Sequence, residues 1–277
     1  MKAFKILYIF LFLGILLSAC EDPIEMDVNG GKPALVVEGW LTNVKHKHYV
    51  NLSATKPLKS TGSFDPVTGA IITLSDGTGK TEVLKEVSPG KYEIATTVGK
   101  EGKTYTLKIQ SSVGNYEAVA PMPRLSMPID SIAFRYQEKS LVYEDPGYYP
   151  HFWGKETPGE GDYMQIKLYK NGKYLNRAQD INLFSDEFVD GNKITDAELT
   201  VDSPFVKGDK ARAEVWSLTE GSYNFWTDIL TQLLNGSVFA SPLTNVRTNV
   251  KKTTTNSMDV TGYFGASMIS AVERKVE

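Results

Sequence analysis

Short apolar runs separated by turn residues fill the chain from Pro33 onwards, and they limit the possible folds more than any other feature. Residues 49–53 and 104–110 alternate apolar and polar side chains, a pattern typical of a β-strand with one buried face. Other short runs follow at similar spacing, without helical patterns among those of the first half. The pattern predicts a mainly β fold of antiparallel, immunoglobulin-like β-sandwiches.

Three prolines within eight residues interrupt the series at Pro121, Pro123 and Pro128. Proline cannot donate to a β-ladder, so this stretch is expected to be an extended connection rather than a central strand. The sequence therefore predicts an N-terminal β-sandwich at 33–121, a Pro-rich linker at 122–128 and a C-terminal β-rich domain at 129–277. At 277 residues the chain is long enough to build two cores by packing alone.

One helix is expected within the C-terminal domain, at about residues 219–234. The apolar side chains fall at helical spacing on one face: Trp226, Ile229, Leu230, Leu233 and Leu234. Ser217 with Glu220 fits a capping box, and Gly236 fits the C-terminal stop. We expect this face to cover one side of the second sheet as part of its core.

Two further patterns define strands of the C-terminal domain. Asn171-Gly172 between residues 164–169 and 173–175 is a strong hairpin signal. Residues 260–271 are expected to form one closing strand, in which Gly262 and Gly265 mark bulges or close backbone approaches.

The first nineteen residues have the pattern of a secretory signal peptide. Lys2 and Lys5 precede an apolar run over residues 6–17, which is short for a membrane span. The run ends in Leu17-Ser18-Ala19-Cys20, which looks like the lipobox of bacterial lipoproteins. That resemblance implies cleavage before Cys20, with a diacylglycerol on its sulfur and an acyl chain on its new amino group. A plain secretory signal with an incidental cysteine is the alternative.

The residues after Cys20 are expected to form a lipidated tether at 20–32. Several acyl chains on one residue hold a protein stably at a membrane. Glu21 and Asp22 resemble the surface-export signal of Bacteroidota lipoproteins, although ordinary linker acidity would look the same. We therefore expect the protein at the outer membrane, exposed on the cell surface rather than facing the periplasm.

The ordered set of motifs resembles one family, the Bacteroidota outer-membrane lipoproteins catalogued as domain of unknown function 4249. The matching pieces include LVVEGWLTN at 35–43, VNLSAT at 50–55, FDPVTGAIITLSDGTG at 64–79, GDYMQIKLYKNGKYL at 161–175 and FVKGDKARAEVWSLTEGSYNFW at 205–226. The resemblance implies an outer-membrane lipoprotein commonly associated with a TonB-dependent transporter. It supplies no catalytic residues.

Composition and motifs limit the chemistry further. A formal net charge of −3, which becomes −5 once Lys2 and Lys5 are removed, argues against nucleic-acid binding. The single cysteine excludes a disulfide framework and any multi-cysteine metal site. No hydrolase elbow and no zinc-protease motif occurs. We therefore expect no catalytic residue, no enzyme activity and no cofactor beyond the lipid on Cys20.

Two groups of side chains have the residue types of potential metal ligands. His46 and His48 would share one face of a strand, but a solvated strand end accounts for them better. The oxygen-bearing side chains that could together hold calcium are Asp180, Asp186, Glu187 and Asp190. Because no EF-hand pattern is present, we expect a polar turn there and no metal site.

Residues 136–163 combine aromatic side chains with prolines and glycines. The candidate contact residues for a partner or a ligand are Tyr143, Tyr148, Tyr149, His151, Phe152 and Trp153. Large rings in a surface loop favour docking onto something, since tyrosine and tryptophan supply interface hot spots. The alternative is that the loop folds back and buries the rings against its own sandwich.

The expected function is that of a non-enzymatic binding or accessory protein on a lipid anchor, associated with a TonB-dependent barrel in nutrient capture or uptake. The ligand is not defined by the sequence. A cell-surface adhesin or structural lipoprotein is the first alternative, and an enzyme acting on surface glycans or peptides is the second.

Overall fold

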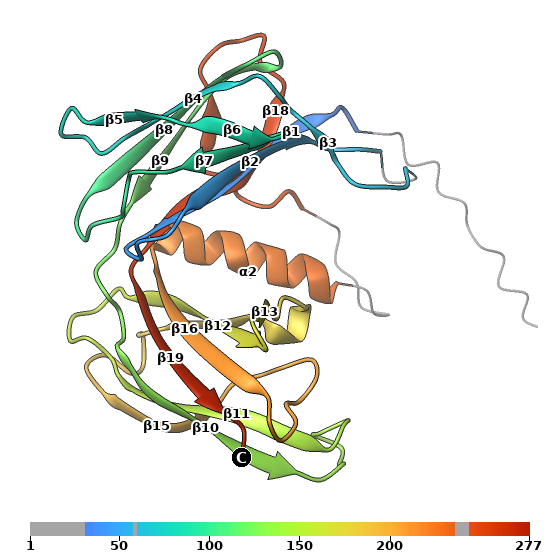
Figure 1. Ribbon diagram of the computed structural model, residues 1–277, viewed down its shortest axis with the longest axis vertical. Coiled ribbons are helices and arrows are strands. Elements are labelled where there is room, and N and C mark those ends of the chain that lie inside the picture. The colour runs from blue at the N-terminus through green and yellow to red at the C-terminus, as the bar shows by residue number, and fades with distance from the viewer. Residues whose placement is uncertain (1–30, 58–59, 236–243) are drawn as a thin grey trace, which may run out of the picture. The chain divides into compact units, whose positions relative to one another are not determined.

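The computed structural model describes residues 31–57, 60–235 and 244–277 of the chain. Within these residues the protein is mainly β, with strands in four sheets and one α-helix, α2 (Glu220–Leu234) (Figure 1). The expected fold class is thereby confirmed: the sheets are predominantly antiparallel and pack in pairs as sandwiches.

The first sandwich has two sheets that enclose one apolar core. One sheet contains β1 (Ala34–Thr42), β2 (His48–Ala54), β3 (Asp65–Pro66), β6 (Lys85–Ser88), β7 (Lys91–Ile94) and β18 (Asp259–Ser267). The other contains β4 (Ile71–Ser75), β5 (Thr81–Val83), β8 (Thr104–Ser111), β9 (Gly114–Pro121) and β17 (Val250–Lys252). The alternation along β8 buries Tyr105, Leu107 and Ile109, whereas their neighbours face outward.

The second sandwich is built in the same way. A three-stranded sheet contains β10 (Ile129–Gln137), β11 (Gly147–Lys155) and β15 (Lys193–Glu198). Its partner sheet contains β12 (Tyr163–Lys170), β13 (Lys173–Tyr174), β14 (Asn182–Ser185), β16 (Lys210–Leu218) and β19 (Ile269–Lys275), with a 3₁₀ turn, η1 (Ala178–Asp180), before β14. The Asn171-Gly172 hairpin is confirmed, because it joins β12 to β13.

The end of the chain returns to the first sandwich. Strand β18 pairs in parallel with β1 from Ala34↔Asp259 to Thr42↔Ser267, and β17 pairs with β9. Strand β19 then pairs with β16 in the second sandwich. Residues 32–277 form one compact unit, in which the last part of the chain contributes strands to both sandwiches.

The region expected to be one closing strand, 260–271, is two strands in sheets of different sandwiches. Gly262 is a close approach, as its pattern predicted: its φ is +89°, and a Cβ there would lie 2.2 Å from the carbonyl oxygen of Val37 on β1. Only glycine allows β18 to lie against β1 at this point.

The Pro-rich stretch 122–128 connects the two sandwiches and packs against both cores. Met122 is buried in the first core and Met127 in the second. Between them, the Ser126 amide donates to the Ser217 hydroxyl of β16 at 2.9 Å. Methionine side chains at both ends therefore fix the connection, which proline content alone could not predict.

Helix α2 begins two residues later than the expected capping box placed it. The N-cap is Thr219, whose hydroxyl accepts from the Ser222 amide at 3.2 Å, while Ser217 is a buried residue of β16. The expected stop at Gly236 lies outside the described residues. The helix contacts β12, β16 and β18 (Figure 1). No helix in the described part of the chain has the length and apolarity that a membrane span requires.

The apolar face of α2 is covered only in part. Trp226, Ile229 and Leu230 are half-buried, whereas Leu233 and Leu234 expose more than half of their surface. The expectation that this face belongs to the core therefore holds only for its N-terminal half.

Candidate functional site

Three of the predicted functional residues belong to the N-terminal segment. The lipidation residue Cys20 and the export residues Glu21 and Asp22 lie outside the described residues.

Most of the candidate aromatic side chains lie on strand β11 rather than in a surface loop. Tyr149, His151 and Phe152 are 8%, 6% and 2% exposed, so these three side chains are interior and not a contact surface. Phe152 points into the second core, while residues 138–146 fold back so that Tyr143 packs on Tyr149 at a centroid distance of 4.6 Å. Tyr148 and Trp153 are half-buried. Strand formation, which the prolines and glycines obscured, explains this burial.

The exposed apolar part of this region is the tip between β10 and β11. Tyr136, Leu141 and Val142 are 53%, 107% and 81% exposed. We call these three residues the β10–β11 tip. The Tyr143 hydroxyl donates to the Glu198 carboxylate at 2.8 Å, which fixes the base of the loop on strand β15.

A second aromatic group lies where both sandwiches meet α2. Trp40 of β1 contacts Trp216 of β16, Trp226 of α2 and Tyr263 of β18, with ring centroids 6.2, 6.1 and 5.9 Å apart. The Trp40 indole donates to the Ser267 hydroxyl at 2.8 Å. We call Trp40, Trp216 and Trp226 the tryptophan cluster. Its members come from three separate elements, so no local motif could have predicted it.

A buried lysine faces the tryptophan cluster. The Lys167 Nζ atom lies 3.4 Å from the centroid of the Trp216 ring and 5.7 and 5.5 Å from those of Trp40 and Trp226. Its side chain is 8% exposed, and burial lowers its pKa to about 7, against the opposing attraction of Glu214. An ammonium over ring faces is stabilised by cation–π attraction.

The carboxylate of Glu214 organises the polar groups beside this lysine. It accepts from Arg212 Nε at 2.7 Å, Trp216 Nε1 at 2.8 Å and the Tyr169 hydroxyl at 3.1 Å. Burial and this carboxylate raise the pKa of Tyr169, whose hydroxyl therefore remains a donor. Glu214 is thus fully engaged in positioning its neighbours.

An acidic cluster lies at the far end of β11. Oxygen atoms of Glu156, Asp186 and Asp190 all lie within 4.8 Å of one another. The sequence pointed to Asp186 and Asp190, but it grouped them with Asp180 and Glu187, which lie outside this cluster. Asp180 instead accepts from the Arg177 and Asp202 amides around η1. Glu156 was missed because it is thirty residues away in the chain and joins the others only through the tertiary fold.

The two histidines expected at a solvated strand end differ from each other. Their ring centroids lie 4.1 Å apart, but only His46 is exposed, and His48 is buried. The His48 Nε2 atom accepts from the Thr42 amide at 3.1 Å. Burial, with a smaller contribution from His46, lowers the pKa of His48 to about 4, so this ring is neutral at physiological pH.

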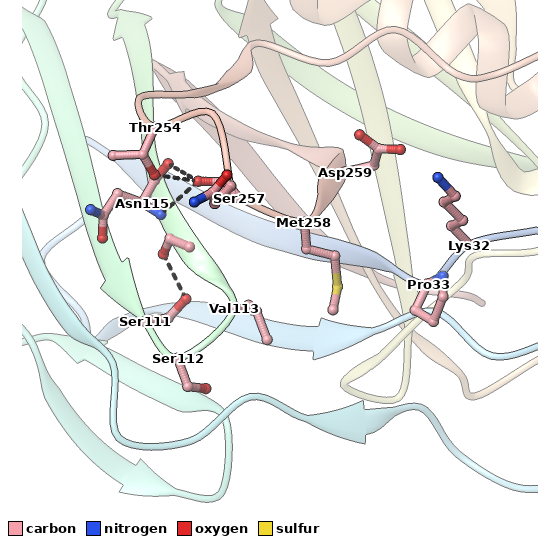
Figure 2. A pocket seen from close by; sticks show the side chains of 12 residues that line it. Lys32, Pro33, Ser111, Ser112, Val113, Asn115, Thr254, Ser257, Met258 and Asp259 are labelled. Atoms are coloured by element: carbon pink, nitrogen blue, oxygen red, sulfur yellow. Dashed lines mark hydrogen bonds between the residues drawn. The ribbon is translucent and has the colours of Figure 1, made fainter.

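A cavity of about 680 Å³ opens between the β8–β9 turn, residues 254–259 and the start of the described chain (Figure 2). Ser257 links its walls: its hydroxyl accepts from the Asn115 amide at 3.0 Å and bonds the Thr254 hydroxyl at 2.7 Å. Asp259 pairs with Lys252 at 2.8 Å. These polar groups satisfy one another and stabilise the turn.

Comparison with known proteins gives a family but no characterised relative. No curated protein matches the chain. The family described as "Domain of unknown function (DUF4249)" matches over residues 21–271, which is nearly all of the sequence after the signal-like segment. The chain therefore belongs to the DUF4249 family.

Proposed function

We propose that the protein is a lipid-anchored, non-enzymatic accessory protein of the outer membrane. It is exposed on the cell surface and contacts a TonB-dependent barrel in nutrient capture or uptake. The anchor is supported by the lipobox-like residues 17–20, in which Cys20 is the single cysteine of the chain. The transporter association is supported by the family resemblance, which implies an outer-membrane lipoprotein commonly associated with a TonB-dependent transporter.

The observation that carries the contact role is the β10–β11 tip. Leu141 and Val142 expose nearly all of their side chains, although burial of a branched aliphatic side chain stabilises a protein by about 1.5–3 kcal/mol. Adjacent exposed apolar residues at a loop tip are typical of an interaction surface.

The tip is held in a defined conformation. The Ser140 hydroxyl accepts from the amides of Val142 and Tyr143 at 3.2 and 3.1 Å, and the Ser140 amide donates to the Tyr143 carbonyl at 2.8 Å. A preorganised turn loses little conformational entropy when it binds. The tip therefore presents Leu141 and Val142 as a ready contact.

The test is affinity purification of the tagged, full-length protein from mildly solubilised membranes, followed by mass spectrometry. The wild type is expected to recover an outer-membrane TonB-dependent barrel. Val142→Asp is expected to lower recovery at least about tenfold, because a charge at an apolar contact is costly to desolvate. The matched control is Val83→Asp, an exposed valine on β5 of the first sandwich, which should leave recovery unchanged.

Two outcomes would contradict the proposal. Repeated purification without any barrel would remove the transporter association. Equal recovery by Val142→Asp and Val83→Asp would remove the β10–β11 tip as the contact. The anchor is tested separately: Cys20→Ala should move the protein out of the membrane fraction, and retention there would contradict lipidation.

A further inference from the structure

We propose that Glu156, Asp186 and Asp190 form a calcium-binding site. The site is independent of the accessory function proposed above. It rests on the way the fold positions three carboxylates, on a buried oxygen atom without a partner, and on the local balance of charge.

Each of the three carboxylates is held by one backbone amide. The Gly191 amide donates to Glu156 Oε2 at 2.5 Å, the Asp162 amide to Asp186 Oδ2 at 2.9 Å, and the Gly159 amide to Asp190 Oδ1 at 2.6 Å. One oxygen of each carboxylate is thus hydrogen-bonded to the backbone, which fixes the orientation of that side chain. The other oxygen of each carboxylate accepts no hydrogen bond from the described residues, so three oxygens are left available to one ion.

The strongest single indication is Glu156. Its side chain is 0% exposed, and its buried Oε1 atom has no hydrogen-bond partner among the residues that the structure describes. A buried carboxylate oxygen with neither water nor a donor is costly, and such groups are usually paired or bound to a metal. Glu156 is one of the three residues whose carboxylate oxygens come within 4.8 Å of one another.

The only guanidinium beside the three carboxylates among the described residues is already engaged. Arg124 pairs with Asp162, to which its Nε donates at 3.1 Å, and it also donates to the carbonyl oxygens of Thr157, Pro158 and Gly159. Asp162 is the main partner of the Arg124 charge, and the attraction of Arg124 to Glu156 and Asp186 is weaker. One guanidinium therefore faces four carboxylates, and the cluster keeps an excess of negative charge. A divalent cation would offset most of this negative charge.

The backbone around the cluster is rigid enough to be a site. Asp186 and Asp190 lie on one tight turn, in which the Val189 amide donates to the Asp186 carbonyl at 2.8 Å. The Glu156 amide donates to the Asn192 carbonyl at 3.0 Å, which joins this turn to the end of β11. Two segments far apart in sequence are thereby fixed against each other.

The chemistry of the donors favours calcium. All three side chains offer carboxylate oxygens, which suit hard cations, whereas zinc selects nitrogen and sulfur ligands. Calcium accepts six to eight oxygens in irregular geometry, so water can complete a site with three carboxylates, one of them exposed. Magnesium requires near-ideal octahedral geometry and gives up its water reluctantly, so a site of carboxylates held by three separate amides is expected to bind it less tightly than calcium.

The test is calorimetric titration of chelator-treated, full-length protein in detergent with CaCl₂ and, separately, MgCl₂. One calcium ion is expected per chain, with binding weaker for magnesium. Asp190→Asn should lower calcium affinity at least about tenfold, since affinity follows the number of charged ligands. This variant keeps an oxygen for the Gly159 amide at an exposed position, so the fold should be preserved. Glu156→Gln should lower affinity at least as much.

The matched control is Glu187→Gln, which removes an exposed carboxylate next to Asp186 but outside the cluster. Its calcium affinity should stay within about twofold of wild type, because only long-range attraction is lost. Absence of calcium binding by the wild type up to about 10 mM would overturn the proposal, since extracellular calcium modules bind more tightly than this. Wild-type affinity in Asp190→Asn, or equal affinity for magnesium, would also overturn it.

Discussion

The Nζ atom of Lys167 lies 3.4 Å from the ring centroid of Trp216, on the face of β12 that points away from the second core. Residues Met164, Ile166 and Leu168 of the same strand fill that core. The outer face is covered as well, by α2 and by Trp40 of the first sandwich. Strand β12 is therefore interior on both faces, and its lysine is enclosed by aromatic rings.

The first prediction concerns the pH dependence of stability that Lys167 causes. Its pKa is about 7 in the folded protein and near 10.5 in the unfolded chain. Between these values the unfolded chain binds more protons, so the free energy of unfolding rises with pH by at most about 1.4 kcal/mol per pH unit from this group. Lys167→Met should remove this pH-dependent contribution. The free energy of unfolding of the variant minus that of the wild type should therefore decrease from pH 7 to pH 9. Urea denaturation at several pH values measures this difference, and a constant difference would contradict the prediction.

The second prediction concerns His48. Its pKa is about 4 in the folded protein against 6.5 in the unfolded chain, so the unfolded chain binds more protons between these values. Stability should therefore decrease as pH falls from 6.5 to 4. His48→Gln keeps an acceptor for the Thr42 amide without titrating, so wild type should lose stability relative to it in this window. NMR titration of the imidazole checks the value directly, and a ring that becomes protonated near pH 6.5 would refute it.

The third prediction concerns the backbone contact between β18 and β1. Gly262→Ala should destabilise the protein by about 3 kcal/mol or more. The new Cβ would clash with the Val37 carbonyl, and a residue with a Cβ is also strained at this positive φ. Gly102→Ala is the control: its φ is +72°, but no atom lies within 4 Å of the added Cβ. It should cost only about 1–2 kcal/mol. Chemical denaturation of both variants gives the comparison, and equal losses would exclude the steric explanation.

The fourth prediction concerns the start of α2. Thr219→Ala removes the acceptor of the Ser222 amide and should lower stability by about 1 kcal/mol. Thr219→Ser retains the hydroxyl and should lie close to wild type. Thermal denaturation of the two variants distinguishes a capping effect from loss of side-chain packing, which both substitutions share in part. Equal destabilisation would mean that the cap contributes little.

Much of the strand pattern was predictable because it depends on residues that are neighbours in the sequence. The alternation over 104–110 and the Asn171-Gly172 hairpin need only local information, and both agree with β8 and with the β12–β13 turn. The same holds for the extent of α2, although Thr219 and not Ser217 caps it. The capping-box spacing favours Ser217, because Glu220 follows it by three residues, but in the structure the Thr219 hydroxyl is the one that accepts from a helix amide.

The relations between distant segments were not predictable in this way. Alternation in β12 places Lys167 on the face opposite the core but says nothing about what covers that face. The acidic turn containing Asp186 and Asp190 was visible, whereas its third member, Glu156, becomes a neighbour only when β11 and the turn are fixed together. Pairing across long sequence separations depends on tertiary packing, which no periodicity encodes.

The parallel pairing of β18 with β1 has a consequence for how the protein is made. During synthesis more than two hundred residues separate the emergence of β1 from that of its partner, since Ala34 pairs with Asp259. Until then one edge of β1 is an open template for other chains. Contacts of such high sequence separation form slowly, because a long loop must close first. The first sandwich is therefore complete only when the last strands are available to pair, and an unpaired β1 edge before that favours aggregation.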